Sequence, residues 1–435
     1  MYKRQVSSFN GRTGAVTPGS SDYTAAQVGA VSTVSTAGGR NFLINGGMDI
    51  WQRGTSFPTF VSNTPQYTAD RWSLLCGSSS QMSASQVSPN ITTSSTTSQL
   101  TVVNATVTIT VGTGLNIFAG NAVQIYNTAS SSGMNGTVTS YNSSTGSLVS
   151  YINYYYGTVG TYSSWVVTIQ QVPFKYALRV QRNSGVTSVG TQYALQPLKT
   201  VNTLPLAGNT VTVSYWARGG ANFSSGSSLL YPNLWTGIGT DQVPYNSGYP
   251  GLTDISTGGA IVLTTAWQKF SYTATINPAV TEVSVGWNYT PVGTAGANDY
   301  FDITGVQLEI GSTATAFSRA GGTIQGELAA CQRYYQTYPN PPLKGLVTST
   351  NQPSRMGTIL HVVMRATPSN SLVGSISLYD GGNTATSSAI TIGYQTASFI
   401  EFDLNVASGT LTAYRPCIAY NNSSVTGTLN LSAEL

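Results

Sequence analysis

The sequence predicts a mainly β protein: an antiparallel, jelly-roll-like sandwich with an inserted small β domain, a short linking helix, a C-terminal β domain and an extended N-terminal arm. Runs that alternate apolar and polar residues recur along most of the 435 residues, and Gly, Pro, Asn or Asp bounds each run. Only one segment shows a convincing helical period. Charged residues make up 7% of the chain and Gly occurs 46 times, as in a turn-rich protein covered by hydroxyls and amides.

Residues 1–40 form the predicted arm. They contain "SFNGRTGAVT" and other Gly-rich stretches, few large apolar residues and no sustained periodicity. Such a segment cannot bury a core of its own, so we expect it to be extended.

Residues 41–92 and 171–320 are predicted to form the sandwich. The segment "RNFLINGGMDIWQRGTSF" opens it with an alternating apolar strand and an Asn45-Gly46 turn. Later strands are predicted in "KYALRVQR", "TVTVSYWARG", "AIVLTTAWQKFSYTATI", "EVSVGWNYT" and "DYFDITGVQLEIG". Each run has one apolar face, which suits two antiparallel sheets packed face to face. The tryptophans in these runs are predicted to lie mostly in the core.

Residues 93–170 differ in composition and are predicted to be an inserted small β domain. They are rich in Ser and Thr, nearly free of charge, and carry short strand patterns such as "TVTITVGTG", "AVQIYN", "GTVTSYN" and "WVVTI". Loop closure costs rise slowly with length, so an insertion between two sandwich strands is tolerated.

The predicted helix is "TIQGELAACQRYYQ", residues 323–336, within a helix and Pro-rich linker spanning 321–342. Its apolar residues recur at spacings of 0, 4, 7 and 11 and form a single seam. Two interpretations stay open: the seam packs on its own domain, or it forms a short three-chain coiled segment on a molecular axis. The seam residues are Ile324, Leu328, Cys331 and Tyr335.

Residues 343–435 are predicted to form the C-terminal β domain. Its strand patterns are "ILHVVMRATPS", "SLVGSISLYD" and "SFIEFDLN".

Several function classes are not expected. The net charge of +4 is spread thinly, without a basic run that would bind nucleic acid. No apolar run approaches 18 residues and no signal peptide is present, so membrane insertion is not expected. The three cysteines, Cys76, Cys331 and Cys417, lie far apart and form neither a disulfide framework nor a zinc motif.

No catalytic residue is predicted. The single histidine, His361, lies in an alternating pattern without an acidic residue nearby, and no nucleophile elbow, metalloprotease motif or phosphate loop occurs. The carboxylates are scattered; Asp299 and Asp302, which flank Tyr300 and Phe301, are interpreted as a turn cap and a solvated strand edge. We therefore expect no enzyme and no cofactor.

Several segments resemble known bacteriophage proteins. "SSFNGRTGAVTPGSSDYTAAQVGA" resembles a segment of phage fibre proteins, and "RNFLINGGMDIWQRGTSF" with "YTADRWSL" resembles the start of a sandwich domain in phage tail-fibre proteins. "FDITGVQLEIGSTATAFSRAGGTIQGELAACQRYYQ" and the ending "TLNLSAEL" are similar to later parts of those proteins. The insert, with "AGNAVQIYNTASSSGMNGTVTSYNSSTGSLVSYI" and "GTYSSW", looks like a small β module of phage structural proteins. Together these matches touch nearly the whole chain, except the loops of the C-terminal domain.

The resemblance implies a homotrimeric fibre on the virion, with the thin arm toward other virion proteins and the globular domains outward. The chain begins directly at the arm motif. Either the arm itself is the anchor, or the sequence is a piece of a longer fibre.

The resemblance also implies a carbohydrate-binding-like sandwich, and aromatic residues in one segment suit sugar binding. Residues 228–251 are predicted to be a long loop carrying Tyr231, Trp235, Tyr245 and Tyr249, whose rings could stack on sugar faces. The alternative is that this loop packs on itself. Some sandwiches of this kind hold a structural calcium where first and last strands meet; Asp49 and Asp302 would be its carboxylate ligands, and a metal-free turn is the alternative.

The sequence patterns and the resemblance together predict a structural fibre protein of a bacteriophage virion, on the tail, that binds a host cell-surface glycan. Two alternatives stay open. One is a head fibre or decoration protein without a receptor, and the other is a glycan-cleaving tailspike, which needs two positioned carboxylates.

Overall fold

The described part of the protein is mainly β with antiparallel strand pairing, as the sequence predicts. The computed structural model describes residues 41–435 apart from 61–62, 64, 78–80, 246–247, 351 and 423. It also describes two short paired strands, β1 (Ser8–Phe9) and β2 (Arg12–Thr13). The rest of the predicted arm, 1–40, lies outside the described residues. No helix in the described ranges is long and apolar enough to cross a bilayer.

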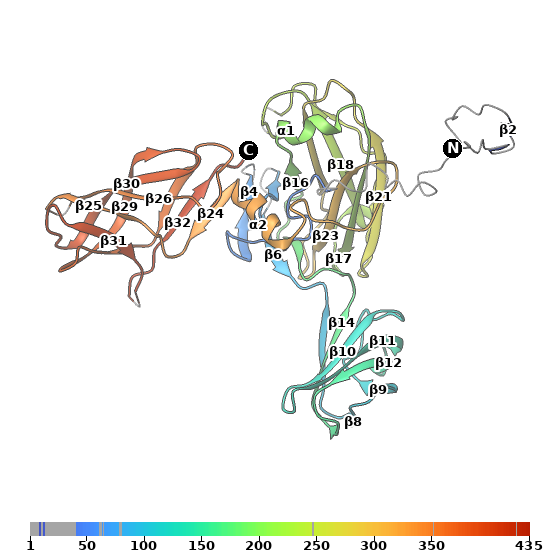
Figure 1. The fold of residues 1–435 in the computed structure, drawn as a ribbon. Coiled ribbons are helices and arrows are strands. Elements are labelled where there is room, and N and C mark those ends of the chain that lie inside the picture. The colour runs from blue at the N-terminus through green and yellow to red at the C-terminus, as the bar shows by residue number, and fades with distance from the viewer. Residues whose placement is uncertain are drawn as a thin grey trace, which may run out of the picture.

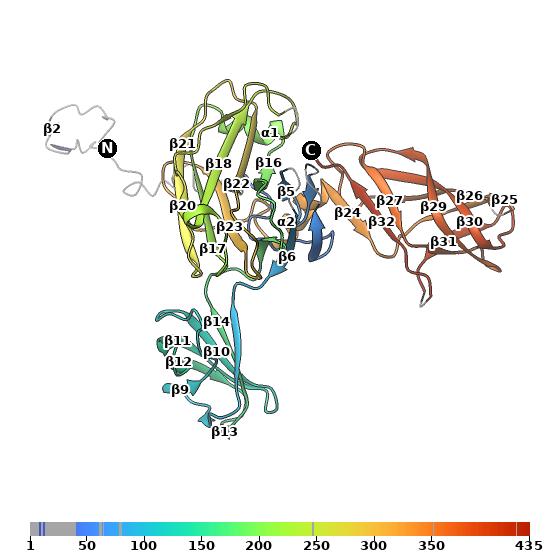
Figure 2. The ribbon, with the colours of Figure 1, turned by 180° about the vertical axis from the view of Figure 1, so that it is seen from behind.

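Residues 41–435 form three β domains, each with its own sheets. Figures 1 and 2 show the sandwich in the middle, the inserted domain below it on two adjoining strands, and the C-terminal domain to one side.

The first sandwich sheet has the strand order β21-β17-β23-β15-β6-β3. Its strands are β3 (Ser56–Phe60), β6 (Met82–Val87), β15 (Ala177–Arg182), β17 (Thr210–Gly219), β21 (Gln268–Thr275) and β23 (Tyr300–Ile310).

The second sandwich sheet has the order β19-β18-β22-β16-β5-β4, and β20 pairs with β18 beside it. Its strands are β4 (Gln66–Tyr67), β5 (Ser73–Cys76), β16 (Gln192–Pro197), β18 (Leu229–Gly237), β19 (Thr253–Asp254), β20 (Ile261–Val262) and β22 (Glu282–Tyr289). Short helical turns, α1 (Thr200–Thr203), η1 (Leu204–Leu206) and η2 (Gly226–Ser228), connect strands.

The sandwich core follows from the alternation in the sequence. On β17, every second residue from Val211 to Ala217 enters the apolar core, and β22 contributes Trp287 from the opposite sheet. The rings of Trp72 and Trp287 lie 5.8 Å apart, centroid to centroid, between the sheets. The prediction that tryptophans of these strands fill the core is therefore confirmed for these two, which are at most 1% exposed.

The opening of the sandwich differs from the prediction. Residues 41–51 form no strand, although the turn at Asn45 is present, with φ of 58°. The Asn45 side chain donates hydrogen bonds to the carbonyls of Ile50 and Asp70, and these bonds fold the segment into a turn. Leu43 and Met48 are thereby buried without strand pairing.

The inserted domain has its own sheets and its own apolar core. Its six-stranded sheet has the order β7-β14-β10-β11-β12-β9, and β8 pairs with β13. The core takes alternate residues of these strands, such as Val123 and Ile125 or Val167 and Ile169. The strands are β7 (Ile91–Ser95), β8 (Leu100–Thr101), β9 (Thr106–Thr110), β10 (Ala122–Asn127), β11 (Ser132–Asn142), β12 (Ser147–Tyr156), β13 (Thr161–Tyr162) and β14 (Trp165–Gln170).

The helix α2 (Ile324–Gln332) is shorter than predicted. Thr323 caps its N-terminus by accepting a hydrogen bond from Gly326 N at 3.1 Å. The chain then enters β24 (Tyr335–Tyr338), which pairs with β32 (Thr428–Ser432). Tertiary strand pairing thus overrides the helical pattern at residues 335–336, and β24 draws part of the predicted linker into the C-terminal sheet.

The C-terminal domain is a closed barrel with the order β25-β26-β30-β29-β28-β31, beside the three-stranded sheet β24-β32-β27. The remaining strands are β25 (Lys344–Ser349), β26 (Gln352–Ile359), β27 (Ser369–Val373), β28 (Ile376–Tyr379), β29 (Thr384–Gln395), β30 (Phe399–Gly409) and β31 (Pro416–Tyr420). The strand predicted at 359–369 is wrong for residues 360–368: the segment turns to bury Leu360 and Met364 and to place Arg365 against Asp241.

Candidate functional site

The outer face of the second sandwich sheet brings together three of the four predicted aromatic residues. Tyr231 and Trp235 lie on strand β18, not in a loop as predicted, and both point away from the core because the alternate residues Leu230 and Leu234 are buried. Tyr245 reaches the same face from the 238–252 loop.

Tyr249, the fourth predicted residue, does not belong to the accessible surface. It is 3% exposed, and burial raises the pKa of its phenol well above the ordinary value. Tyr249 packs against the backbone of Gly237, where an added Cβ would lie 2.4 Å from the tyrosine Cβ. Its role is to hold the 238–252 loop on the sheet, which supports the alternative interpretation for this one residue.

Strand register adds a residue that was not predicted from the sequence. Tyr231 lies opposite Asn288 on β22, which lies opposite Tyr193 on β16, which lies opposite Leu75 on β5. Tyr193 therefore stands on the same outer face. The alternation in "QYALQP" is the signal that could have placed it there.

The rings of Tyr193, Trp235 and Tyr245 border a hollow of about 240 Å³, and Tyr231 lies on the same face outside it. The Tyr193 and Trp235 ring centroids are 6.4 Å apart, with planes inclined at 49°. The hydroxyls of Tyr245 and Ser73 lie 3.4 Å apart at its edge. The lining residues are Leu75, Tyr193, Leu195, Trp235, Pro244, Tyr245 and Leu252.

Gly286 leaves room for the Trp235 ring on the outer face of the sheet. It occupies the centre of the face, in register between Asn233 and Leu195. A Cβ at this position would lie 2.7 Å from Cζ3 of Trp235 and 2.6 Å from the Ala194 carbonyl. The absence of a side chain therefore lets the indole lie across the sheet, where its ring lines the hollow.

A chain of polar side chains runs beside the rings. Asn288 Nδ2 donates to Asn233 Oδ1 at 2.6 Å, and Asn233 Nδ2 donates to Asp254 Oδ2 at 2.6 Å. Asp254 also accepts from the backbone N–H of Leu234 at 3.0 Å. These bonds fix the orientation of both amides. The amide N–H and oxygen positions that these bonds do not use are therefore oriented in advance for a ligand.

A buried carboxyl supports the loop end of the face. Glu282 on β22 accepts a hydrogen bond from the Thr200 hydroxyl. Burial raises the pKa of Glu282, while the Thr200 bond and the backbone N–H groups of Gln242 and Asp241 oppose that rise. Glu282 is 0% exposed and so cannot touch a ligand directly.

This geometry can hold a flat, hydroxylated molecule: rings offer apolar faces for stacking, and adjacent amides offer both donors and acceptors.

No family model matches the chain, and no curated protein matches it. Solved structures with partial similarity include the enzymatically active domain of tailspike protein 4 from bacteriophage CBA120, at 10% identity and a TM-score of 0.21 over 32% of this chain and 16% of that one. The xylan-binding CBM22-2 domain of Xyn10C from Paenibacillus barcinonensis has 12% identity and a TM-score of 0.22, over 32% of this chain and 81% of that one.

A carbohydrate-binding module of the β-sandwich superfamily has 14% identity and a TM-score of 0.22, over 51% of this chain and 97% of that one. A triple-jelly-roll turret protein of an archaeal virus has 7% identity and a TM-score of 0.16, over 88% and 92%. Because every TM-score is far below 0.5, these similarities assign no activity to the chain.

The two proposed calcium ligands are both held by arginines. Asp302 is 0% exposed and accepts hydrogen bonds from Arg179 Nε at 2.8 Å and Nη2 at 3.0 Å and from Arg218 Nε at 2.8 Å. Asp49 accepts from Arg319 Nη2 at 2.7 Å. A cation at Asp302 would compete with two guanidinium groups, so the residues do not fit the calcium hypothesis. No group of three or more His, Cys, Asp or Glu in the described ranges could hold a metal ion.

The predicted helical seam is not a continuous exposed stripe. Cys331 is 1% exposed and packs with Ile44 and Tyr334 of the same chain. Tyr335 is buried on β24, where the guanidinium carbon of Arg53 lies 3.6 Å from its ring centroid. Ile324 is 40% exposed and Leu328 is half-buried. These placements agree with packing on the chain's own domain and correct the coiled-segment interpretation for Cys331 and Tyr335.

The histidine and the paired carboxylates have structural partners. His361 lies outside regular strands, with its ring 5.2 Å from that of Tyr338. The predicted turn cap at Asp299 is a buried ion pair instead: Asp299 is 0% exposed and lies 3.4 Å from Arg182 Nη1.

Proposed function

We propose that this chain is a structural fibre protein of a bacteriophage virion, and that its sandwich binds a host cell-surface glycan through the outer face of the second sheet. The observation that carries the binding role is the arrangement of Trp235, Tyr193 and Tyr231 beside the Asn288–Asn233–Asp254 chain.

A glycan suits this face chemically. The apolar side of a sugar ring stacks on an aromatic side chain, while its hydroxyls exchange hydrogen bonds with amides. Asn233 and Asn288 provide those amides, and Asp254 is the one carboxylate among these three hydrogen-bonded side chains. An aromatic contact at a binding hot spot is worth about 2 kcal/mol, so one face binds weakly and a multivalent particle gains its affinity from many faces.

The fibre assignment is supported by the sequence resemblance of the arm, the sandwich and the C-terminal strand to phage fibre proteins. We propose the corresponding assembly: a homotrimer, attached to other virion proteins through residues 1–40 and located on the tail. Binding without cleavage belongs to the same proposal. It is supported by the arginine pairing of Asp299 and Asp302, which leaves these carboxylates bound to structural partners.

The binding role is tested with the full chain and surface polysaccharide purified from the bacterium that the phage infects. We expect the polysaccharide to retard the wild-type protein in affinity electrophoresis, and the double variant Tyr193→Ala/Trp235→Ala to lose the retardation. Tyr394→Ala is the matched control, because Tyr394 is 58% exposed on the C-terminal domain.

Equal retardation of the double variant and the wild type would exclude this face. Release of reducing sugar ends during incubation would instead favour the tailspike alternative. Electron microscopy of virions labelled with antibody against this chain distinguishes tail from head location.

A further inference from the structure

The inserted domain carries a second row of aromatic side chains on the outer face of its six-stranded sheet. Tyr126 on β10 lies opposite Gly133 on β11, which lies opposite Tyr156 on β12. In the next row, Tyr154 lies opposite Asn135, which lies opposite Gln124. The residues that alternate with Gln124 and Tyr126 on β10, Val123 and Ile125, face the core, so the tyrosines and amides share the outer face.

The three tyrosine rings form a continuous surface. Tyr126 and Tyr156 have centroids 6.4 Å apart and planes inclined at 25°, and Tyr154 and Tyr156 are 6.2 Å apart at 31°. Tyr154 is 58% exposed. A Cβ on Gly133 would lie 2.5 Å from Cζ of Tyr156, so this ring lies across a glycine, as Trp235 lies across Gly286 in the sandwich.

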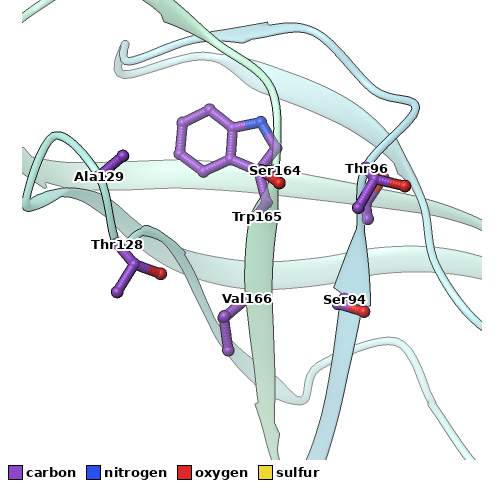
Figure 3. Close-up of a pocket in the computed structure, with 8 residues that line it drawn as sticks. Ser94, Thr96, Thr128, Ala129, Ser164, Trp165 and Val166 are labelled. Atoms are coloured by element: carbon purple, nitrogen blue, oxygen red, sulfur yellow. The ribbon is translucent and has the colours of Figure 1, made fainter.

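Two hollows flank the tyrosines, one toward each end of the strands. Toward the sandwich is a groove of about 360 Å³, lined mainly by amide and hydroxyl side chains. At the far end is a pocket of about 240 Å³, in which Figure 3 shows Thr128 and Ala129 on one side of Val166 and Ser94 and Thr96 on the other. Val166 lies opposite Tyr126, so the rings connect the two hollows. Gln170 lines the groove and Val166 lines the pocket. These two residues are four positions apart on β14, so the two hollows are separated by about 13 Å along the strand.

The groove contains hydrogen-bond acceptors that the folded chain does not use. The side chains of Asn90 and Asn135 line the groove and are half-buried, and the Oδ1 atom of each has no hydrogen-bond partner within the described part of the chain. Buried polar atoms in folded proteins are normally satisfied, so two such acceptors in one groove indicate a place for donors from a ligand. Gln124 also lines the groove and donates to the Tyr156 hydroxyl at 3.3 Å, which joins the amides to the rings.

The absence of charged residues from this part of the sequence favours a neutral ligand. Residues 72–174 contain no Asp, Glu, Lys, Arg or His. An acidic polysaccharide or a phosphate would find no cation here, whereas a neutral sugar needs only amides, hydroxyls and ring faces.

We propose that this face of the inserted domain is a second glycan-binding site, specific for a neutral oligosaccharide, with Tyr126, Tyr154 and Tyr156 as the stacking surface and Asn90 and Asn135 as acceptors. The site is separate from the sandwich face and does not depend on its function. A second copy of the chain is the competing occupant.

The test uses the full chain and affinity electrophoresis through gels that contain dextran, mannan, xylan, β-glucan or galactan, with polygalacturonate as an acidic comparison. Tyr154→Ala/Tyr156→Ala is the test variant, and Tyr394→Ala, with the same 58% exposure as Tyr154, is its control. Both are made in the wild-type chain and in the Tyr193→Ala/Trp235→Ala background. We expect at least one neutral polysaccharide to retard the Tyr193→Ala/Trp235→Ala protein. Adding Tyr154→Ala/Tyr156→Ala to that protein should weaken its affinity for the polysaccharide about tenfold.

Asn135→Asp keeps the shape of the groove and adds a buried charge, so it should weaken the same retardation. Light scattering and near-UV circular dichroism establish that each variant keeps its mass and fold. The proposal is overturned if no neutral polysaccharide retards the Tyr193→Ala/Trp235→Ala background, or if the tyrosine variant leaves that retardation unchanged. It is also overturned if the tyrosine variant lowers the oligomeric mass, which would assign the face to contact between copies.

Discussion

Arg71 and Glu434 form a buried ion pair across 363 positions of sequence, and this pair fixes the end of the chain to the sandwich. The arginine side chain is 1% exposed and the glutamate side chain 7%. Arg71 also donates to the Pro197 carbonyl at 2.8 Å, and its guanidinium carbon lies 3.7 Å from the Tyr334 ring centroid. Arg53 donates to the other oxygen of Glu434 at 2.9 Å, so the carboxylate is held by two cations.

Glu434→Ala should therefore lower the free energy of unfolding by about 3 kcal/mol, because it leaves a buried guanidinium without its partner. Urea titration followed by tryptophan fluorescence reports this loss from the sandwich and insert, since residues 343–435 contain no Trp. Glu401→Ala is the control: its partner Arg355 is 74% exposed, and we expect a loss below about 1 kcal/mol. Equal effects of the two substitutions would contradict the role assigned to the buried pair.

Gly286→Ala should displace the Trp235 ring and weaken glycan binding while the sandwich stays folded. The new Cβ would meet both the indole and the Ala194 carbonyl, so we also expect a loss of stability of about 1–3 kcal/mol. Quenching of tryptophan fluorescence by iodide measures ring exposure, and affinity electrophoresis measures binding. Gly259→Ala, where an added Cβ meets nothing within 4 Å but φ is positive at 58°, controls for a glycine loss elsewhere. Unchanged binding by Gly286→Ala would show that the position of the ring is not critical.

Replacing residues 91–170 with a short Gly-Ser bridge should leave the sandwich folded. The insert has a separate core, and its first and last strands are neighbours, with Ile91 opposite Ile169. Asn116, whose side chain donates to the Thr265 carbonyl at 3.0 Å, is one contact that the deletion removes. A soluble product with a cooperative thermal transition is the expected result. Insoluble protein under all refolding conditions would mean that the insert is part of the sandwich fold.

Glu327 should make stability depend on pH. It accepts hydrogen bonds from the backbone N–H groups of Asn45 and Gly321, but burial raises its pKa above the usual 4.5. The folded state therefore holds the proton more tightly than the unfolded state. This stabilisation is complete below pH 4.5 and is lost as pH rises through the folded-state pKa. The unfolding free energy of the wild type should thus fall relative to that of Glu327→Gln, which does not titrate, as the pH rises above 4.5. A rise of the wild-type value relative to Glu327→Gln over this range would contradict the raised pKa.

The chain should assemble as a homotrimer through residues 1–40. Multi-angle light scattering should give about three times the chain mass of 45.7 kDa. Removing residues 1–40 should yield monomers, because Cys331 and Tyr335 are buried within their own chain and leave no continuous helical seam in the described residues. A full-length monomer at micromolar concentration would contradict the prediction, and a trimer without the arm would place the interface elsewhere.

Sequence periodicity predicted the regular strands well where apolar residues enter the core at alternate positions. The pattern "TVTVSYWARG" coincides with β17, since its apolar residues enter the core at every second position. Sequence periodicity failed where side-chain hydrogen bonds or pairing with a distant strand determine the backbone conformation. Asn45 folds residues 41–50 into turns, and the pairing of Tyr335 with Ser432 ends the helical pattern early.

The site was predicted in part for a related reason. Aromatic composition identified Trp235 and Tyr231, but the many turn residues of 228–251 predicted a loop there, so their strand was missed. Tyr193 joins them through register with Asn288, and Tyr249 leaves the surface through contact with Gly237. Such pairings join residues far apart along the chain, and local patterns cannot specify them.

The antiparallel joint between Ile91 and Ile169 also has an evolutionary consequence. Because the chain enters and leaves the insert through adjacent strands, two in-frame crossovers can exchange the whole module while every sandwich strand keeps its partners. On the function proposed above, a lineage under pressure from a changing host surface could replace one of the two proposed binding specificities in a single recombination event. The other proposed binding face and the proposed anchorage to the particle would be inherited unchanged.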